Sequence, residues 1–274
     1  MTTPQPDTGE RQPASITVMT YNIRLDVSRD GGNSWAYRRD DVNAVIGNAD
    51  PDVFCVQEAL PHQLQDLQRL NGYDCVAFGR DDGAGAGEHA GIFFRAGRFN
   101  LGERGRFWLS PTPDLPSAGW GAHYRRMATW VNLGDRQTGK PLTLLCTHLD
   151  HKSEEARVNG AAVLIERLGR IAGGRPVILA GDFNETPERP AIQLLLRHLQ
   201  DCRAVSQSPA VGPDGTFNDF TFQNIVPPVR IDYIFITPDV TVLRQSHIVT
   251  ITPDGRLPSD HFPVLAQVQI RPRK

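Results

Sequence analysis

The stretch "PVILAGDFNETP" at residues 176–187 joins an apolar run to a polar turn. Its first half predicts a short strand that is buried on both faces. Asp182 and Asn184 follow this strand directly, and Thr186 with Pro187 predicts the N-cap and first turn of a helix. In α/β proteins, binding sites are commonly built at this place, between the C-terminal edge of a strand and the next helix. A plain turn is the alternative, because Asp and Asn both favour turns.

The composition of the chain is that of a globular protein with a sizeable core. Of its 274 residues, 39% are hydrophobic and 22% are charged, values that suit one large α/β domain. The net charge is −2 and the isoelectric point is near 6.4, so the chain has no general attraction for polyanions. A protein that holds long nucleic acid usually presents a basic face, so the charge balance counts mildly against a nuclease.

The N-terminal segment and the cysteines bear on where the protein works. Residues 1–14 are polar and proline-rich without an apolar core, which predicts a disordered tail rather than a signal peptide, followed by a single domain over residues 15–274. No apolar run approaches membrane-spanning length. The four cysteines form no CxxC pair, so we expect them to be reduced and mostly buried. These features predict a cytoplasmic monomer without a membrane anchor.

Strand and helix signals alternate along the chain from Ser15 onward. Strands are predicted at residues 16–24, 51–60, 73–79, 89–95, 105–110, 126–133, 140–150, 175–182, 230–237, 240–249 and 261–270. Helices are predicted at residues 37–50, 62–70, 153–174 and 191–199. Two strand-rich halves with helices outside them suggest an α/β fold, a four-layer sandwich of two packed mixed β-sheets. The loop at residues 110–121 is long and rich in Pro, Gly and Ser, a kind of loop that often carries function.

Polar side chains stand at the ends of these apolar strands or interrupt them. They are Asn22, Glu58, His148, Asp182, Asn184, Asp232, Asp260 and His261. Burying one uncompensated carboxylate costs several kcal/mol, so the carboxylates in this set need shared compensation. A divalent cation supplies it, and Mg²⁺ or Mn²⁺ prefers the oxygen ligands that Asn, Asp and Glu offer. The sequence therefore predicts a Mg²⁺ or Mn²⁺ site at the strand ends.

Six short segments contain all of these residues. They are "TYNIR" (20–24), "VQE" (56–58), "THLD" (147–150), "AGDFN" (180–184), "RIDYIF" (230–235) and "SDHFPV" (259–264). In content and order they resemble the motifs of the endonuclease/exonuclease/phosphatase superfamily, and the resemblance extends from about Ser15 to Ile270. It implies a DNase I-like sandwich and a hydrolase that acts on phosphate esters with a divalent metal.

The resemblance implies a role for each matching residue. Glu58 would be the principal metal carboxylate, with Asn22 and Asp260 completing the metal site. Asp182 would activate or orient the attacking water, and Asn184 would hold a phosphate oxygen. In-line attack puts charge on the phosphate oxygens, which a cation and an amide can stabilise.

The resemblance also implies roles for two histidines. Asp232 would pair with His261, fix its tautomer and stabilise it as a cation beside the phosphate. His148 matches the second histidine of the DNase I-like members, which stands near the leaving oxygen. Glu88, ahead of the strand "HAGIFFR", occupies the place of the glutamate that orients this histidine in DNase I.

Further charged positions lie close to the motifs. Arg126 fits a basic position that some family members use on the phosphate, Arg125 is its competitor, and a solvated surface arginine is the alternative for either. Asp150 is predicted to support the site or to contact the substrate. Arg24 stands where the apurinic endonucleases carry an acid, which weakens an apurinic-repair function.

Two histidines and three tryptophans near the motifs have open roles. They are His62, His151, Trp35, Trp108 and Trp120. A tryptophan could stack on a base or sugar, although packing is favoured for Trp108, which lies in a predicted strand. His62 is interpreted as a surface histidine of a helix.

The resemblance implies a Mg²⁺- or Mn²⁺-dependent phosphodiesterase rather than a monoesterase, within a compact bacterial group. The charge balance favours a small phosphodiester as substrate, from a lipid headgroup, a sugar or a nucleotide. A nuclease acting on DNA or RNA is the first alternative. A non-catalytic binding module on the same fold is the second, disfavoured because every catalytic position of the family carries a competent residue.

Overall fold

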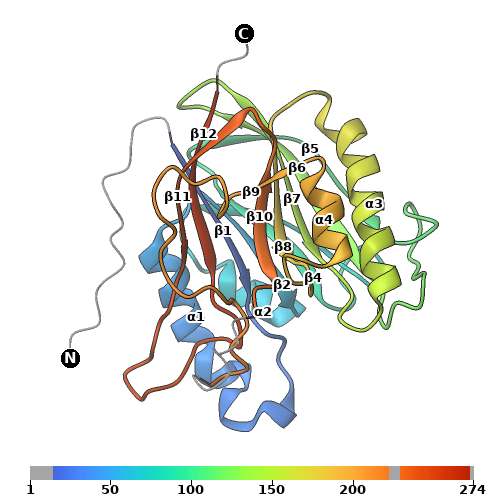
Figure 1. Cartoon of the computed structure of the whole chain (residues 1–274). Coiled ribbons are helices and arrows are strands. Elements are labelled where there is room, and N and C mark those ends of the chain that lie inside the picture. Colours follow the sequence, from blue (N-terminus) through green and yellow to red (C-terminus); the bar gives the residue numbers. More distant parts are fainter. Residues whose placement is uncertain (1–14, 222–228, 272–274) are drawn as a thin grey trace.

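The chain folds into two six-stranded sheets that pack face to face (Figure 1). The computed structural model describes residues 15–221 and 229–271, and the predicted tail at residues 1–14 lies outside them. The first sheet contains, in spatial order, β11 (Val240–His247), β12 (Val264–Ile270), β1 (Ile16–Asn22), β2 (Val53–Ala59), β4 (His89–Arg95) and β3 (Tyr73–Gly79). The second contains β5 (Phe99–Trp108), β6 (Met127–Asp135), β7 (Pro141–His148), β8 (Val177–Asp182), β10 (Asp232–Ile236) and β9 (Gln200–Asp201).

Helices cover the outer faces of both sheets. They are α1 (Trp35–Ala49), α2 (Pro61–Leu67), α3 (Glu154–Ala172) and α4 (Pro190–Leu196), and a 3-10 turn, η1 (Ser28–Asn33), precedes α1. Ser153 caps α3, because its hydroxyl accepts the backbone N–H of Ala156 at 3.1 Å.

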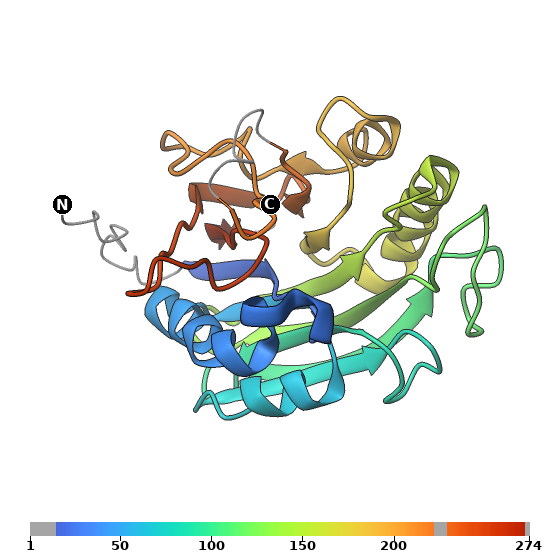
Figure 2. The same cartoon turned by 90° about the horizontal axis from the view of Figure 1, so that it is seen from below.

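Apolar side chains divide the molecule into four layers. A cluster that includes Val18, Ile92 and Leu144 fills the space between the sheets. A second cluster, which includes Val42, joins α1 to the outer face of the first sheet, and a third, which includes Leu164, joins α3 to the second sheet. Figure 2 shows the helices lying outside the two sheets. Both sheets pair strands in parallel and antiparallel directions, so the predicted four-layer α/β sandwich is confirmed.

The strand directions bring the polar strand ends to one edge of the sandwich. β1 runs parallel to β2, and β7 runs parallel to β8, where His148 lies in register with Asp182. β10 runs antiparallel to β8 and begins with Asp232 opposite Asp182. β12 runs antiparallel to β1, so its start, just after His261, lies near Asn22 at the end of β1. Residues far apart in the chain therefore meet at this edge.

The helix predicted at Thr186 and Pro187 begins later than expected. α4 starts at Pro190, and its N-cap residue is Arg189, which has an extended backbone. Proline disfavours helical geometry in the residue before it, so a helix that started at Pro187 would be interrupted at Arg189. The prediction of Thr186 as N-cap is therefore wrong. The strand and the helix are separated by a short loop, which carries Asn184.

Other elements differ from the prediction in extent. β5 starts at Phe99 rather than at the predicted Gly105. The first part of the strand was missed because it contains several consecutive exposed residues, such as Glu103 and Arg104, and so lacks the alternation of apolar and polar residues that predicts a strand. The short elements η1 and β9 have no strong apolar pattern and were not predicted.

The four cysteines are all free, and three of them, Cys55, Cys146 and Cys202, are buried as predicted. In the part of the chain that the structure describes, no helix combines the length and the apolar character needed to span a bilayer.

Candidate active site

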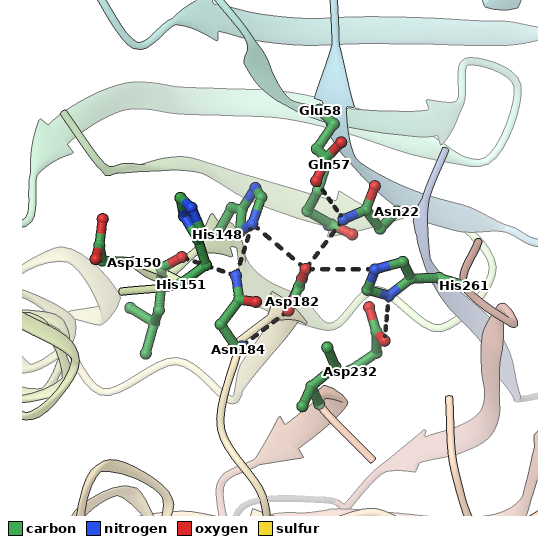
Figure 3. A network of polar contacts seen from close by, with 12 residues as sticks. Asn22, Gln57, Glu58, His148, Asp150, His151, Asp182, Asn184, Asp232 and His261 are labelled. Atoms are coloured by element: carbon green, nitrogen blue, oxygen red, sulfur yellow. Dashed lines mark hydrogen bonds and ion pairs between the residues drawn. The ribbon is translucent and has the colours of Figure 1, made fainter. Parts of the chain in front are cut away.

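Asp182 lies at the centre of the polar side chains at this edge (Figure 3). Its Oδ2 atom accepts a hydrogen bond from Asn22 Nδ2 at 3.0 Å. The same oxygen lies 3.3 Å from His148 Nε2 and 3.9 Å from His261 Nε2. Its Oδ1 atom accepts the backbone N–H of Asn184 at 2.8 Å. One carboxylate thus contacts an amide and faces two imidazoles from separate parts of the chain.

Glu58 reaches the same site from the other sheet because a bulge interrupts its strand. The pairing of β2 with β4 shifts register between Val56 and Ala59, and Glu58 has a φ of 64°, in the left-handed region. A bulge re-aims a side chain, and strained backbone of this kind clusters at functional sites. The carboxylate accepts hydrogen bonds from Asn22 Nδ2 at 3.1 Å and from the Leu25 N–H at 3.1 Å. Asn22 therefore bridges one carboxylate from each sheet.

The two other predicted metal residues, Asn22 and Asp260, are buried close to Glu58. Asn22 directs its amide nitrogen to the carboxylates, while its Oδ1 atom accepts the backbone N–H of Arg24 at 3.0 Å. Asp260 lies 3.6 Å from Arg24 Nη1, and its Oδ1 atom accepts the Ser259 hydroxyl at 3.3 Å. The arginine that departs from the apurinic endonuclease pattern thus pairs with a carboxylate of the site.

Asp232 holds His261 in one orientation. His261 Nδ1 lies 2.8 Å from Asp232 Oδ2, and both residues are buried. Burial lowers the pKa of His261, but the charge of Asp232 and its hydrogen bond raise that pKa well above the ordinary value. These interactions favour the cationic form of His261, and its Nε2 is directed toward Asp182. The structure brings these residues together as the motifs predict.

His148 has the opposite electrostatic environment. Burial, followed by the charges of Arg126 and Arg80, holds the pKa of His148 well below the usual value. Asn184 Nδ2 lies 2.9 Å from His148 Nε2 and 3.1 Å from the carbonyl oxygen of Leu149. Because a carbonyl only accepts, this Asn184 atom is the amide nitrogen, and it donates to His148 Nε2. Both the low pKa and this contact favour a neutral His148 with its proton on Nδ1.

Two buried carboxylates of the site, Asp182 and Asp260, have raised pKa values. Burial, and then the charge of Asp232, raises the pKa of Asp182 to about 7. Burial raises the pKa of Asp260 to about 6 against the attraction of His261, and the charge of Glu58 adds to the rise. Excess negative charge of this kind fits a bound cation.

Among the described residues, two groups of ligand atoms lie close enough to hold one ion. The atoms of each group lie within 4.8 Å of one another: Glu58, His148 and Asp182 in the first, and Asp182, Asp232 and His261 in the second. The second group is a poor metal site because His261 is a cation that already binds Asp232. In the first, Glu58 and Asp182 offer the oxygen ligands that a hard divalent cation prefers. These two carboxylates are therefore the residues that would hold a metal.

Glu88 reaches the site, but its carboxylate binds Arg80 at 2.7 Å. Glu88 and His148 line one small pocket together with Glu58, Arg80 and Arg126. Within residues 15–221 and 229–271, no hydrogen bond joins Glu88 to His148. The role of Glu88 in orienting His148 therefore stays a prediction.

Arg126, and not its competitor Arg125, lies in this pocket. Arg126 is only 5% exposed, and its Nη2 atom lies 3.2 Å from His151 Nδ1. Arg125 is exposed and donates to the backbone carbonyl of Asp81 at 2.8 Å. Arg126, with His151 beside it, therefore lies next to Glu58 and His148, and its contact with a phosphate stays a prediction.

Asp150 organises the loops that surround the pocket. Its two carboxylate oxygens accept backbone N–H groups, from His123 at 2.9 Å, Lys152 at 2.9 Å and Ser153 at 2.8 Å. Asp150 is buried, and these bonds occupy both oxygens. Of the two roles left open by the sequence, this geometry matches support of the site rather than contact with a substrate.

The remaining candidates lie outside the cluster. His62 pairs with Asp26 at 3.0 Å on the surface. Trp35 and Trp108 are buried, and their indole N–H groups bind Asp66 at 2.9 Å and the carbonyl of Arg80 at 2.8 Å. Neither ring is available for stacking on a base or sugar. Trp120 is partly exposed in the loop before Arg126.

Arg80 was not among the residues predicted from the sequence. It directly follows the predicted strand at residues 73–79, so its position resembles that of the other polar strand-end residues. The sequence therefore contained an indication of this residue, but the glycine-rich loop after Arg80 made the position look like part of a flexible loop.

The two-sheet sandwich and the site at its edge define a protein of the DNase I-like class. A family model for the endonuclease/exonuclease/phosphatase family matches residues 19–261, and the chain belongs to this family. Its members are hydrolases that act on phosphoester bonds.

Solved structures with a third of the residues identical share the whole fold. The chain is 36% identical to an endonuclease/exonuclease/phosphatase from Bacteroides vulgatus, over 94% of this chain and 99% of that chain, with a TM-score of 0.89. It is 34% identical to a mannosyl-6-phosphatase from Bacteroides thetaiotaomicron, over 92% of this chain and 99% of that chain, with a TM-score of 0.86. It is also 22% identical to nocturnin from Drosophila melanogaster over 87% of this chain. The chain spans less than half the length of the curated relatives it matches, 42% for nocturnin.

Proposed function

We propose that the protein is a Mg²⁺- or Mn²⁺-dependent phosphoesterase that hydrolyses a small phosphate ester by in-line attack of water. The observation that carries this proposal is the position of Asp182, between a cationic His261 and a neutral His148 and bridged to Glu58 by one amide. Such a site combines a base, a fixed cation and carboxylate metal ligands.

The side chains have distinct roles in this proposal. Asp182 would orient the attacking water and accept its proton. His261 would donate its Nε2–H to a phosphate oxygen as negative charge develops there, and Asp232 would keep the imidazole charged. Asn184 would donate to a second phosphate oxygen in place of the hydrogen bond that its amide nitrogen makes to His148 Nε2.

A divalent cation would supply further positive charge at the phosphate oxygens and the leaving group. Glu58 and Asp182 would hold it, with Asn22 and Asp260 as the further predicted ligands. The raised pKa values of Asp182, about 7, and Asp260, about 6, support a cation here, because burial and a neighbouring carboxylate disfavour the ionised form of each and a bound cation would offset both effects.

The substrate we propose is a phosphate ester of a sugar or of another molecule of that size. Similarity to a mannosyl-6-phosphatase, at 34% identity over 92% of the chain, supports a phosphorylated sugar and with it a monoester. The motifs alone favour a small phosphodiester. A net charge of −2 argues against long nucleic acid as the substrate.

We also propose that residues 15–274 act as a single-domain monomer in the cytoplasm. The four free cysteines support a reducing compartment, where disulfides are rare.

The proposal is tested with purified protein and four substrates: mannose 6-phosphate, p-nitrophenyl phosphate, bis-p-nitrophenyl phosphate and single-stranded DNA. We expect hydrolysis of a small ester that requires Mg²⁺ or Mn²⁺, stops with EDTA and is lost in Asp182→Asn. The matched control is Asp254→Asn, which removes an exposed carboxylate. Hydrolysis that persists in EDTA, or in Asp182→Asn at the wild-type rate, would contradict the proposal.

A further inference from the structure

We infer that Arg80 binds the phosphate group of the substrate and, together with Arg126, makes the site prefer phosphate monoesters over phosphodiesters. This inference rests on the proposed function and narrows it to one class of ester. It is carried by the way in which the fold immobilises Arg80 and leaves one of its donors unused.

The backbone of Arg80 is fixed at the point where the loop at residues 80–88 leaves β3. Its N–H donates to the carbonyl of Glu88 at 3.0 Å, which closes the loop. Its own carbonyl accepts the indole N–H of the buried Trp108 at 2.8 Å. The first sheet and the second sheet therefore both hold this residue in place.

The guanidinium of Arg80 is held on one edge and on one face. Its Nη1 atom lies 2.7 Å from Glu88 Oε2, and its Cζ atom lies 4.3 Å from the centre of the Tyr124 ring. The residue is 9% exposed, and within the described residues its Nε has no hydrogen-bond partner. A buried N–H without a partner costs free energy that an acceptor atom would recover. The side chain is thus preorganised for a ligand.

Arg126, which directly precedes β6 of the second sheet, is also buried and, among the described residues, also has an unused Nε–H group. It is 5% exposed, and its Nε also lacks a hydrogen-bond partner in the described part of the chain, with the Asp150 carboxylate 3.9 Å away. Both arginines line the pocket that contains Glu58 and His148. Two guanidiniums with an unused N–H therefore border one small space beside the proposed metal carboxylate.

The charge of this pocket distinguishes the two classes of ester. A phosphate monoester carries a charge of about −1.5 to −2 at neutral pH and three terminal oxygens, whereas a diester carries a single charge and two such oxygens. Glu88 offsets one of the two guanidinium charges, and the cation proposed at Glu58 would offset that carboxylate, so one positive charge is left to match the second charge of the monoester. The planar fork of arginine also suits paired phosphate oxygens.

The inference is tested with two substrates that share a leaving group, p-nitrophenyl phosphate and methyl p-nitrophenyl phosphate. In Arg80→Gln we expect kcat/KM to fall about 10- to 100-fold on the monoester and less than about 5-fold on the diester, because only the monoester uses the additional charge. The matched control, Arg125→Gln, removes an exposed arginine next to the pocket and should leave the ratio of the two rates unchanged. Equal losses on the two substrates in Arg80→Gln would overturn the inference.

A second variant distinguishes loss of phosphate binding from misfolding. It is needed because Arg80→Gln leaves the buried Glu88 without its partner. Arg80→Gln combined with Glu88→Gln removes the ion pair as a unit, and its melting curve reports the fold. Calorimetry with inorganic phosphate and metal-loaded protein gives a readout independent of turnover: we expect weaker phosphate binding in both variants. Unchanged phosphate affinity in folded protein would overturn the role of Arg80. A wild-type protein that hydrolyses neither ester would contradict the proposed function instead, and the phosphate titration would still test Arg80.

Discussion

His261 and Asp232 form a buried ion pair in which the imidazole Nδ1 lies 2.8 Å from the carboxylate Oδ2. The other oxygen of Asp232 is buried and has no hydrogen-bond partner among the described residues. The charge of Asp232 is therefore available to His261 alone within hydrogen-bond distance. This pair fixes both the tautomer and the charge of the imidazole that faces Asp182.

The variant Asp232→Asn tests this relationship. An amide can still accept a hydrogen bond from Nδ1, but it removes the charge that raises the pKa of His261 against burial. We expect kcat to fall about 100-fold or more, as with the loss of a preorganised donor to a developing oxyanion. The pH profile should also move, because the remaining effect of burial lowers the pKa of His261. A variant with normal melting temperature and an unchanged pH profile would contradict a catalytic charge on His261.

Glu58→Gln tests the metal site while keeping the shape of the side chain. The amide oxygen can still accept the N–H of Asn22, so we expect the fold to persist. Most metal-dependent activity should be lost, and the Mg²⁺ concentration for half-maximal activity should rise. The control is Glu166→Gln on the exposed face of α3. Hydrolysis near the wild-type rate at each Mg²⁺ concentration would show that Glu58 is not the main metal carboxylate.

Metal binding should stabilise the protein in a pH-dependent way. The pKa of Asp182, about 7, and that of Asp260, about 6, lie above the ordinary value, so the metal-free fold loses stability as pH rises from about 4 to about 7. A cation binds the ionised carboxylates and removes this penalty. Millimolar Mg²⁺ or Mn²⁺ should therefore raise the melting temperature more at about pH 8 than at about pH 5.5. Equal rises at the two pH values would speak against these carboxylates as ligands.

Arg38 links the site to the fold through backbone carbonyls. Arg38 is buried, and its guanidinium donates to the carbonyls of Ile23 and Arg24, which follow Asn22, and of Pro258, two residues before Asp260. It also donates to the carbonyl of Asn33, at the end of η1. Arg38→Gln leaves several of these carbonyls without a donor, so we expect a loss of about 2–4 kcal/mol in the free energy of unfolding and weaker Mg²⁺ binding. The neighbouring Arg39→Gln, on the helix surface, should change neither quantity. Denaturant unfolding and a metal titration measure both effects.

The sandwich could be predicted because the strands alternate with amphipathic helices, and because polar residues interrupt apolar strands at matching places. Asn22, Glu58 and Asp182 are far apart in the sequence, yet parallel pairing within each sheet brings their strand ends to one edge. Local residue types decide such features, so the motifs were sufficient for the cluster.

Other features depend on contacts that a sequence pattern does not contain. The start of α4 is decided by the pair Arg189–Pro190 and not by Thr186, which has a suitable side chain but no helix to cap. The position of the Arg80 guanidinium depends on its stacking against Tyr124, a residue from another loop. Glu88 could be expected near His148, but its ion pair with Arg80 arises only when β3, β4 and the loop between them fold together.

In the proposed mechanism His148 assists the leaving oxygen, but its low pKa disfavours the protonated imidazole before substrate binds. Burial and the charges of Arg126 and Arg80 cause this, and a phosphate anion bound by these arginines would offset their charge and raise the pKa of His148. The imidazole could then protonate the leaving group. Such help matters for a basic alkoxide and hardly matters for p-nitrophenolate, which leaves without a proton.

The comparison of His148→Ala with His261→Ala therefore separates protonation of the leaving group from stabilisation of the phosphate. Both substrates are phosphate monoesters. His148→Ala should reduce kcat about 100-fold on mannose 6-phosphate, whose leaving group is an alkoxide, and less than about 10-fold on p-nitrophenyl phosphate. His261→Ala should be severe on both, because it stabilises the phosphate whatever leaves. The melting temperature of each variant controls for the fold. Equal losses for His148→Ala on the two substrates would remove its role as an acid, and His148 would then serve to hold Asn184, 2.9 Å away, in place.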